Sequence, residues 1–162
     1  MILGLSISAF TLLHVLLSLA GIATGLVAIV GLIYNRLFRA FTAVFLATTI
    51  LTSATGFLFP FKGFTPGIIL GILSIVALMI ATVALYGQKL LGAWRGAYVL
   101  SASTALYFNV FVLFAQLFAK VPALKAVAPS QTSPAFGLTQ VVVLVIFIFL
   151  TTRAFKGFRE TK

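Results

Sequence analysis

The chain has 162 residues, of which 62% are hydrophobic and only 7% are charged, so a soluble globular fold, which carries about 25% charged residues, is excluded. It has no cysteine, which excludes disulfides, thiolate catalysis and cysteine-held metal or iron–sulfur sites. Its net charge of +10 arises from 11 Lys and Arg against one acidic residue, so paired-carboxylate catalysis and acidic proton relays are excluded as well.

The few charged residues divide the chain into five long apolar runs. Each exceeds the roughly 20 residues that a helix needs to cross about 30 Å of hydrocarbon. Backbone polar groups must be paired in lipid, and the runs are continuously apolar rather than alternating, so helices are predicted and not barrel strands. The predicted fold is all-α, a single transmembrane domain over residues 1–162. Its spans are predicted at residues 8–34, 40–60, 66–86, 96–119 and 135–152.

In the first predicted span, polar and small residues recur at steps of three and four and therefore form one stripe along the helix. The stripe includes His14, Gly21 and Gly25. Such a stripe is expected to face protein, and the Gly-x-x-x-Gly pair predicts close helix packing. For His14, a hydrogen-bonded interfacial side chain stands beside two functional alternatives, a single axial ligand and a quinone contact.

The second predicted span concentrates hydroxyl side chains in its later half, among them Thr52 and Thr55. Hydroxyls can bond to carbonyls of their own helix, so helix packing is one interpretation and a polar lining is the other. The third predicted span repeats the glycine spacing at Gly67 and Gly71, which predicts a second close helix contact.

The fourth predicted span places Asn109 and Gln116 seven residues apart on one face, with Tyr107 on another. Carboxamides in hydrocarbon need partners, so this face is expected to meet another helix, a cofactor or a partner subunit. Residues 120–134 form the longest connection and are expected to be a loop. Gln140 lies near the start of the fifth predicted span.

Basic residues gather in alternate connections. If the N-terminus is outside, eight of them lie on the inner side and three on the outer side, as the positive-inside rule requires. The predicted topology therefore has the N-terminus outside and the C-terminus in the cytoplasm. An aromatic belt is then expected at the inner interface, formed by Tyr34, Tyr86, Trp94 and Tyr98.

With this topology, most of the polar side chains that need partners fall toward the outer leaflet, with two nearer the centre. We treat them together as the candidate polar site: His14, Thr52, Thr55, Tyr107, Asn109, Gln116 and Gln140. One histidine, no cysteine and one acid in the tail supply no ligand set for haem, metal or an iron–sulfur cluster. No cofactor held by this chain alone is expected, nor an enzyme, because a catalytic triad and a phosphate-binding glycine loop are also missing.

Several strings of the sequence resemble an uncharacterised family of small bacterial multi-pass membrane proteins. They include Thr11-Leu12-Leu13-His14, Thr55-Gly56-Phe57-Leu58-Phe59-Pro60 and Gly63-Phe64-Thr65-Pro66. In that family a histidine often stands where this chain has Lys62. The resemblance implies the bacterial inner membrane and carries no established activity with it.

Three functions fit these features. The first is a non-catalytic accessory subunit of a larger respiratory or photosynthetic membrane complex, which would pack against lipids, other subunits or a pigment. The second is a small transporter or channel for a neutral or anionic solute. The third is a quinone- or lipid-binding module around His14, Tyr107, Asn109 and Gln116. Nucleic acid is not an expected partner, because the basic residues serve to orient insertion.

Overall fold

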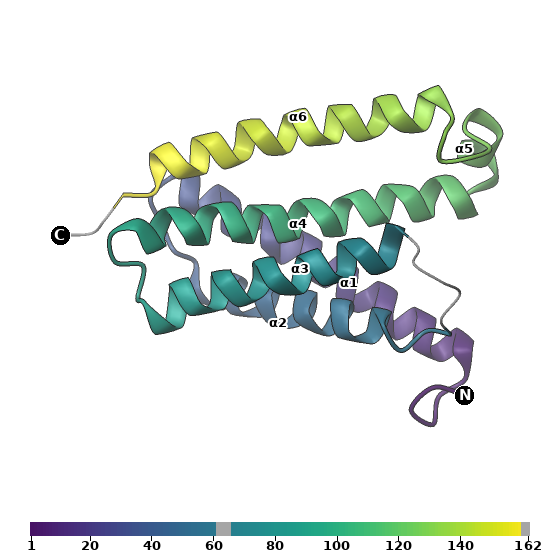
Figure 1. Ribbon diagram of the computed structural model, residues 1–162, viewed down its shortest axis with the longest axis horizontal. Helices are drawn as coiled ribbons and strands as arrows, with labels where there is room; N and C mark the ends of the chain where they lie inside the picture. Colours follow the sequence, from purple (N-terminus) through teal and green to yellow (C-terminus); the bar gives the residue numbers. More distant parts are fainter. Residues whose placement is uncertain (61–65, 160–162) are drawn as a thin grey trace.

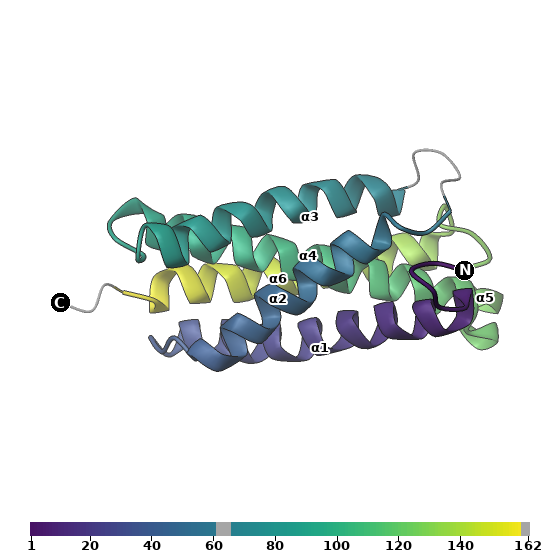
Figure 2. The ribbon, with the colours of Figure 1, turned by 90° about the horizontal axis from the view of Figure 1, so that it is seen from below.

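The computed structural model of the protein describes residues 1–60 and 66–159. In these ranges the chain is all-α, and its long helices lie side by side in an elongated bundle (Figures 1 and 2). The elements are α1 (Ile7–Ile33), α2 (Arg39–Gly56), α3 (Pro66–Thr82), the π-helical turn η1 (Val83–Gly87), α4 (Ala93–Lys120), α5 (Pro122–Val127) and α6 (Pro134–Gly157).

Each predicted span coincides with a long helix. Four of these are long and apolar enough to cross a membrane, namely α1, α3 with η1, α4 and α6, which confirms a multi-pass helical membrane protein. Among the described helices, α2 is not one of the four. It begins with Arg39 and carries many threonines, which lower its hydropathy, but its 18 residues span about 27 Å at about 1.5 Å per residue.

The five long helices form a closed ring. Along the ring, α1 packs on α2, α2 on α3, α3 on α4, α4 on α6, and α6 returns to α1; α4 also contacts α1 and α2. In the most apolar 18-residue stretch of α4, 50% of the residues are buried, whereas in that of α6 only 22% are. Val99, Ala105 and Leu106 of α4 are completely buried, so α4 supplies the centre of the core and α6 faces largely outward.

Basic residues collect at one end of the bundle, where the α1–α2 and α3–α4 connections meet the C-terminal end of α6 (Figure 1). We call this the basic end. Its described cations are Arg36, Arg39, Lys89, Arg95, Arg153, Lys156 and Arg159. The opposite end carries Lys120, the last residue of α4, and Lys125, which lies within α5.

The turn after α1 is fixed by its backbone hydrogen bonds. Asn35 has a left-handed φ of 56°, which asparagine tolerates better than most residues. The amide of Arg36 donates to the Gly31 carbonyl at 2.8 Å and that of Asn35 donates to Leu32 at 3.1 Å, the Schellman pattern of a helix C-terminus. The Asn35 side chain then accepts from the Arg159 amide at 2.9 Å and so joins this turn to the end of α6.

Glycines mark the closest helix contacts. An added Cβ at Gly21 would lie 2.8 Å from the Thr49 hydroxyl, and one at Gly71 would lie 3.1 Å from the Phe57 ring. Gly67 is exposed in the first turn of α3. Three further close approaches were not anticipated from spacing; they occur at Gly31, Gly96 and Gly157.

Two local features depart from the sequence expectation. Residues 120–134 are not a loop throughout, because Pro122 starts the short helix α5, as proline readily does at a first helical position. Tyr98 does not join an interfacial belt, since it is 1% exposed and packs in the core. The other three belt aromatics, Tyr34, Tyr86 and Trp94, are exposed.

Gly25→Ala is expected to destabilise the bundle, whereas Gly137→Ala is not. A Cβ at Gly25 would lie 2.7 Å from Leu106 Cδ1 and 2.8 Å from Phe45 Cδ2, while at Gly137 nothing lies within 4 Å. We expect Gly25→Ala to cost about 1–3 kcal/mol and to lower the thermal midpoint in detergent. Gly137→Ala should leave the midpoint unchanged or raise it, because alanine favours helix. Equal midpoints for the two variants would contradict the close approach at Gly25.

Candidate functional site

The first polar contact joins α1 to α2. His14 Nδ1 lies 2.8 Å from the Thr55 hydroxyl oxygen, and that hydroxyl donates to the Leu51 carbonyl at 2.7 Å. Because a hydroxyl has a single proton, Nδ1 is the donor to Thr55, and Nε2 is left as an acceptor. The imidazole packs edge-on against Phe59 with ring centroids 5.3 Å apart. His14 therefore acts here as a hydrogen-bonded link between two helices.

The second polar contact joins α1 to α4. The Ser18 hydroxyl donates to Asn109 Oδ1 at 2.7 Å, and Asn109 Nδ2 lies 3.5 Å from the Ser18 carbonyl. Asn109 is 7% exposed. Ser18 follows His14 by one helical turn, so the polar stripe of α1 meets α2 first and then α4.

A third contact joins α4 to α6. Gln140 Nε2 donates to the Phe111 carbonyl at 3.2 Å, and Gln140 Oε1 is buried without a partner. The amide thus holds the start of α6 against α4 with one of its two ends.

The remaining residues of the candidate polar site lie elsewhere. Thr52 donates to the Thr48 carbonyl of its own helix at 2.8 Å. Tyr107 faces α6, where its ring lies 5.6 Å from that of Phe147. Gln116 is exposed. The structure therefore brings His14 and Thr55 together, places Asn109 one turn further along α1, and separates Tyr107, Gln116 and Gln140 from them.

A groove between α4 and α6 contains hydroxyls that sequence reasoning did not group. Its volume is about 300 Å³, and we call it the α4/α6 groove, lined by Leu100, Ser103, Thr104, Tyr107, Leu144, Phe147, Ile148, Thr151 and Thr152. The spacing of Ser103 and Tyr107, one helical turn apart, was a signal that could have identified it.

Four hydroxyls of this groove lack hydrogen-bond partners among the described residues, namely those of Ser103, Thr104, Tyr107 and Thr151. Ser103 is 2% exposed, and its Oγ makes no hydrogen bond. No hydrogen bond of the Tyr107 hydroxyl occurs within residues 1–60 and 66–159 either. Thr152, by contrast, donates to the Ile148 carbonyl at 2.7 Å. The groove therefore contains one buried hydroxyl without a partner, that of Ser103, and the partly exposed hydroxyl of Tyr107.

The described residues contain no cluster of three His, Cys, Asp or Glu side chains that could hold a metal ion. A comparison of the chain with protein-family models, with curated proteins and with solved structures finds no match. The strings that carry the family resemblance include residues 61–65 with Lys62, which lie outside the described ranges.

Ser18→Ala and Asn109→Ala are expected to be energetically coupled. Their hydrogen bond joins two helices, and such bonds in membrane bundles contribute about 0.6 kcal/mol on average and about 1.7 kcal/mol at most. A double-mutant cycle on unfolding in mixed micelles measures the coupling. The matched pair Ser18→Ala and Gln140→Ala, which share no bond, should be additive. If the Ser18 and Asn109 changes were additive as well, their hydrogen bond would not contribute to the stability of the bundle.

Proposed function

We propose that the protein is a small non-catalytic subunit of a larger membrane assembly, and that the α4/α6 groove receives a transmembrane helix of a partner subunit. The observation that carries this proposal is that two hydroxyls of that groove make no hydrogen bond among the described residues: that of Ser103, which is buried, and that of Tyr107, which is partly exposed. Hydrocarbon contains no water to bond them, so an unpaired hydroxyl there is costly. A neighbouring helix with a polar acceptor would remove that cost.

The character of α6 supports the same proposal. It is the least buried of the candidate spans, and its outward face carries large apolar side chains such as Val145 and Phe149. A partner helix lying along the groove would contact this face and the hydroxyls together. The partner chemistry that fits is a helix with small residues for close approach and one carbonyl or carboxamide acceptor.

The polar contacts inside the bundle support a structural role more than a conducting one. Ser18 bonds to Asn109, His14 to Thr55, and Gln140 to the backbone of α4. Each pair joins two helices, which is the usual use of polar side chains in membrane bundles.

We further propose that α2 is a fifth span and that the basic end lies in the cytoplasm of a bacterial cell, with the bundle in its inner membrane. In Figure 2, α2 runs along the bundle beside α1, and the N-terminal end of α1 and the C-terminal end of α6 lie at opposite ends of the bundle. An odd number of crossings accounts for that placement, and cytoplasmic connections favour Lys and Arg.

Thr104→Trp is expected to displace the partner subunit. The residue is exposed and lines the α4/α6 groove, so an indole there fills the space that a partner helix needs. Val76→Trp puts the same side chain on the exposed face of α3, where Val76 is 45% exposed, and serves as the control. After mild detergent extraction, a stoichiometric subunit should co-purify with the wild type and Val76→Trp and be absent from Thr104→Trp.

If Thr104→Trp lost a bound quinone and not a subunit, the quinone-module alternative would be favoured, because a quinone carbonyl could accept a hydrogen bond from the Tyr107 hydroxyl. A solute flux in liposomes that Asn109→Leu abolishes in a folded bundle would favour the transporter alternative. Either result overturns the subunit proposal.

Single-cysteine labelling tests the orientation, since the chain has no native cysteine. We expect Gln131→Cys to react with an impermeant maleimide added outside intact cells, and Lys156→Cys to react only after the inner membrane is opened. Both positions are exposed. Labelling of position 131 from the cytoplasmic side alone would reverse the proposed topology.

A further inference from the structure

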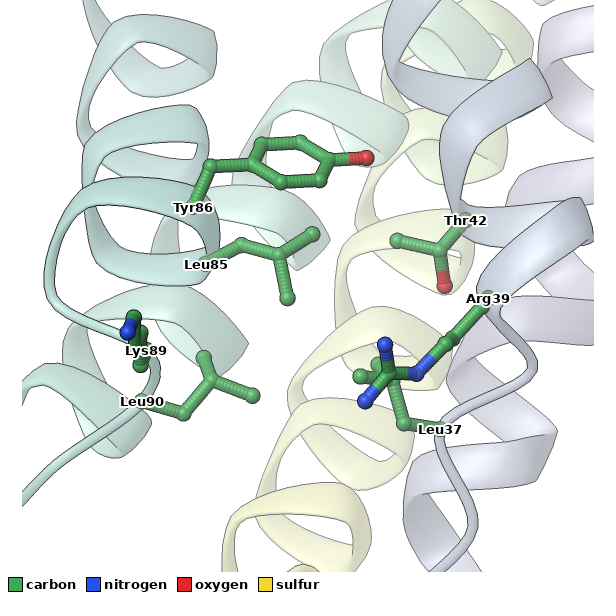
Figure 3. Close-up of a pocket in the computed structure, with 7 residues that line it drawn as sticks. All are labelled: Leu37, Arg39, Thr42, Leu85, Tyr86, Lys89 and Leu90. Carbon is green, nitrogen blue, oxygen red and sulfur yellow. The ribbon is translucent and has the colours of Figure 1, made fainter.

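A second cavity, separate from the α4/α6 groove, lies at the basic end. It opens between the start of α2 and the turn that follows α3, and its volume is about 370 Å³ (Figure 3). We call it the basic pocket, lined by Leu37, Arg39, Thr42, Leu85, Tyr86, Lys89 and Leu90. This volume lies within the range of about 300–1,000 Å³ that is typical of small-molecule sites.

Two cations belong to this pocket. Arg39 comes from the α2 wall and Lys89 from the opposite wall (Figure 3). No side-chain carboxylate lies among the described residues, because the single acidic residue, Glu160, falls outside them. The first turn of α2 adds positive potential, since the N-cap residue Phe38 makes no side-chain cap and the turn holds no acidic residue. An anion is therefore the ligand that complements the pocket.

A buried hydroxyl in the wall also lacks an acceptor. Thr42 is 1% exposed, and its Oγ1 has no hydrogen-bond partner. Thr48, Thr52 and Thr55 of the same helix all donate to the carbonyl four residues back, whereas Thr42 does not. The Tyr98 hydroxyl lies close enough to interact with Thr42, although the pair does not meet the geometry of a hydrogen bond.

The Thr42 hydroxyl points toward the part of the pocket that holds Arg39 (Figure 3). A ligand oxygen beside Arg39 would thus have both a charge partner and a hydroxyl donor. Anionic oxygens accept such bonds more strongly than neutral ones.

The opposite wall is a turn with two residues in left-handed backbone conformation. The π-helical turn η1 ends α3, and the next residues include Lys89 at φ 50° and Leu90 at φ 62°. Left-handed φ values are rare for such residues and cost about 1–3 kcal/mol each. The amide of Leu90 donates back to the Ala84 carbonyl at 2.9 Å, which keeps this turn folded against the helix end.

The surroundings of the pocket are those of a membrane interface. Tyr86 is 59% exposed at its edge, and tyrosine is enriched at the depth of lipid headgroups. Leu37, Leu85 and Leu90 supply apolar lining beside the two cations. Lipid phosphates lie at this depth, and basic pockets between transmembrane helices bind anionic headgroups.

We propose that the basic pocket binds the phosphate of an anionic phospholipid, with Arg39 and Lys89 as charge partners and Thr42 as hydroxyl donor. The leucines of the pocket would contact the adjoining glycerol and acyl carbons. This inference is independent of the α4/α6 groove, of the partner subunit and of which leaflet the basic end faces, because both leaflets carry phosphates.

Native mass spectrometry of the full-length protein in a neutral detergent, titrated with dioleoylphosphatidylglycerol, tests the proposal. We expect one saturable lipid that dioleoylphosphatidylcholine does not replace. The double variant Arg39→Gln with Lys89→Gln should weaken binding about 30-fold, because each basic residue near a lipid surface contributes about 1 kcal/mol to binding. Thr42→Val should weaken it about fivefold.

Arg153→Gln with Lys156→Gln is the matched control, because it removes two exposed charges from the same end outside the pocket. Its affinity should stay within about twofold of the wild type. Thr42→Val should also keep or raise the thermal midpoint of the lipid-free protein, since it removes an unpaired buried hydroxyl. A role of Thr42 in folding alone would lower that midpoint and leave lipid affinity unchanged.

Three results would overturn the proposal. Equal losses in the two charge-removal variants would mean diffuse attraction to the basic end and no site. Equal binding of the two lipids would mean that the net negative charge of the lipid is not recognised, since both lipids carry a phosphate. Saturable binding of inorganic phosphate that excludes dioleoylphosphatidylglycerol would make a free anion the ligand in place of a lipid.

Discussion

Close approach of α1 to α2 and α4 is the contact on which the rest of the bundle depends. Apolar helices in lipid gain little from leaving their surroundings, so they associate through close packing and polar bonds. Gly21 and Gly25 permit both at once. A Cβ at Gly21 would lie 3.4 Å from Asn109 Nδ2 as well as against Thr49, so the same short distance that packs the helices also brings Ser18 within hydrogen-bond reach of Asn109.

The central helix α4 has two polar faces with different states. Toward α1, Asn109 is bonded, and this face has completed its contacts within the chain. Toward the α4/α6 groove, Ser103 is buried but makes no hydrogen bond. The contacts of this face are therefore not completed within the chain. The difference separates polar groups that hold the bundle together from polar groups that have no partner within it. Residue type alone does not reveal that difference.

The sequence predicted the helices well because charges, prolines and glycines punctuate it. The first span was predicted at residues 8–34 and α1 occupies Ile7–Ile33; the fourth was predicted at 96–119 and α4 occupies Ala93–Lys120. The π-helical turn η1 and the short helix α5 were not predicted, since neither has a hydrophobic period of its own. Their shape depends on contacts with the rest of the chain.

The candidate polar site was predictable only in part. Spacing correctly grouped the stripe of α1, because it concerns one helix. Spacing also put Asn109 and Gln116 on one face of α4, yet Asn109 meets α1 while Gln116 is exposed. A face describes where side chains point on their own helix, and it does not say how far along that helix a neighbour stays in contact. The order of helices around the ring is a tertiary property that a single sequence does not encode in its periodicity.

The ring order also determines when the bundle can be completed during synthesis. The helix that closes the ring, α6, follows the other four long helices in the sequence, and it packs on α1, the first of them. The Asn35 side chain accepts a hydrogen bond from the amide of Arg159, which is 124 residues later in the sequence. Until α6 has been synthesised, the earlier helices can form only an open arc, in which the α6-facing sides of α4 and α1 are uncovered. Closure of the ring therefore depends on a single docking step, in which α6 packs on α1 and α4 together.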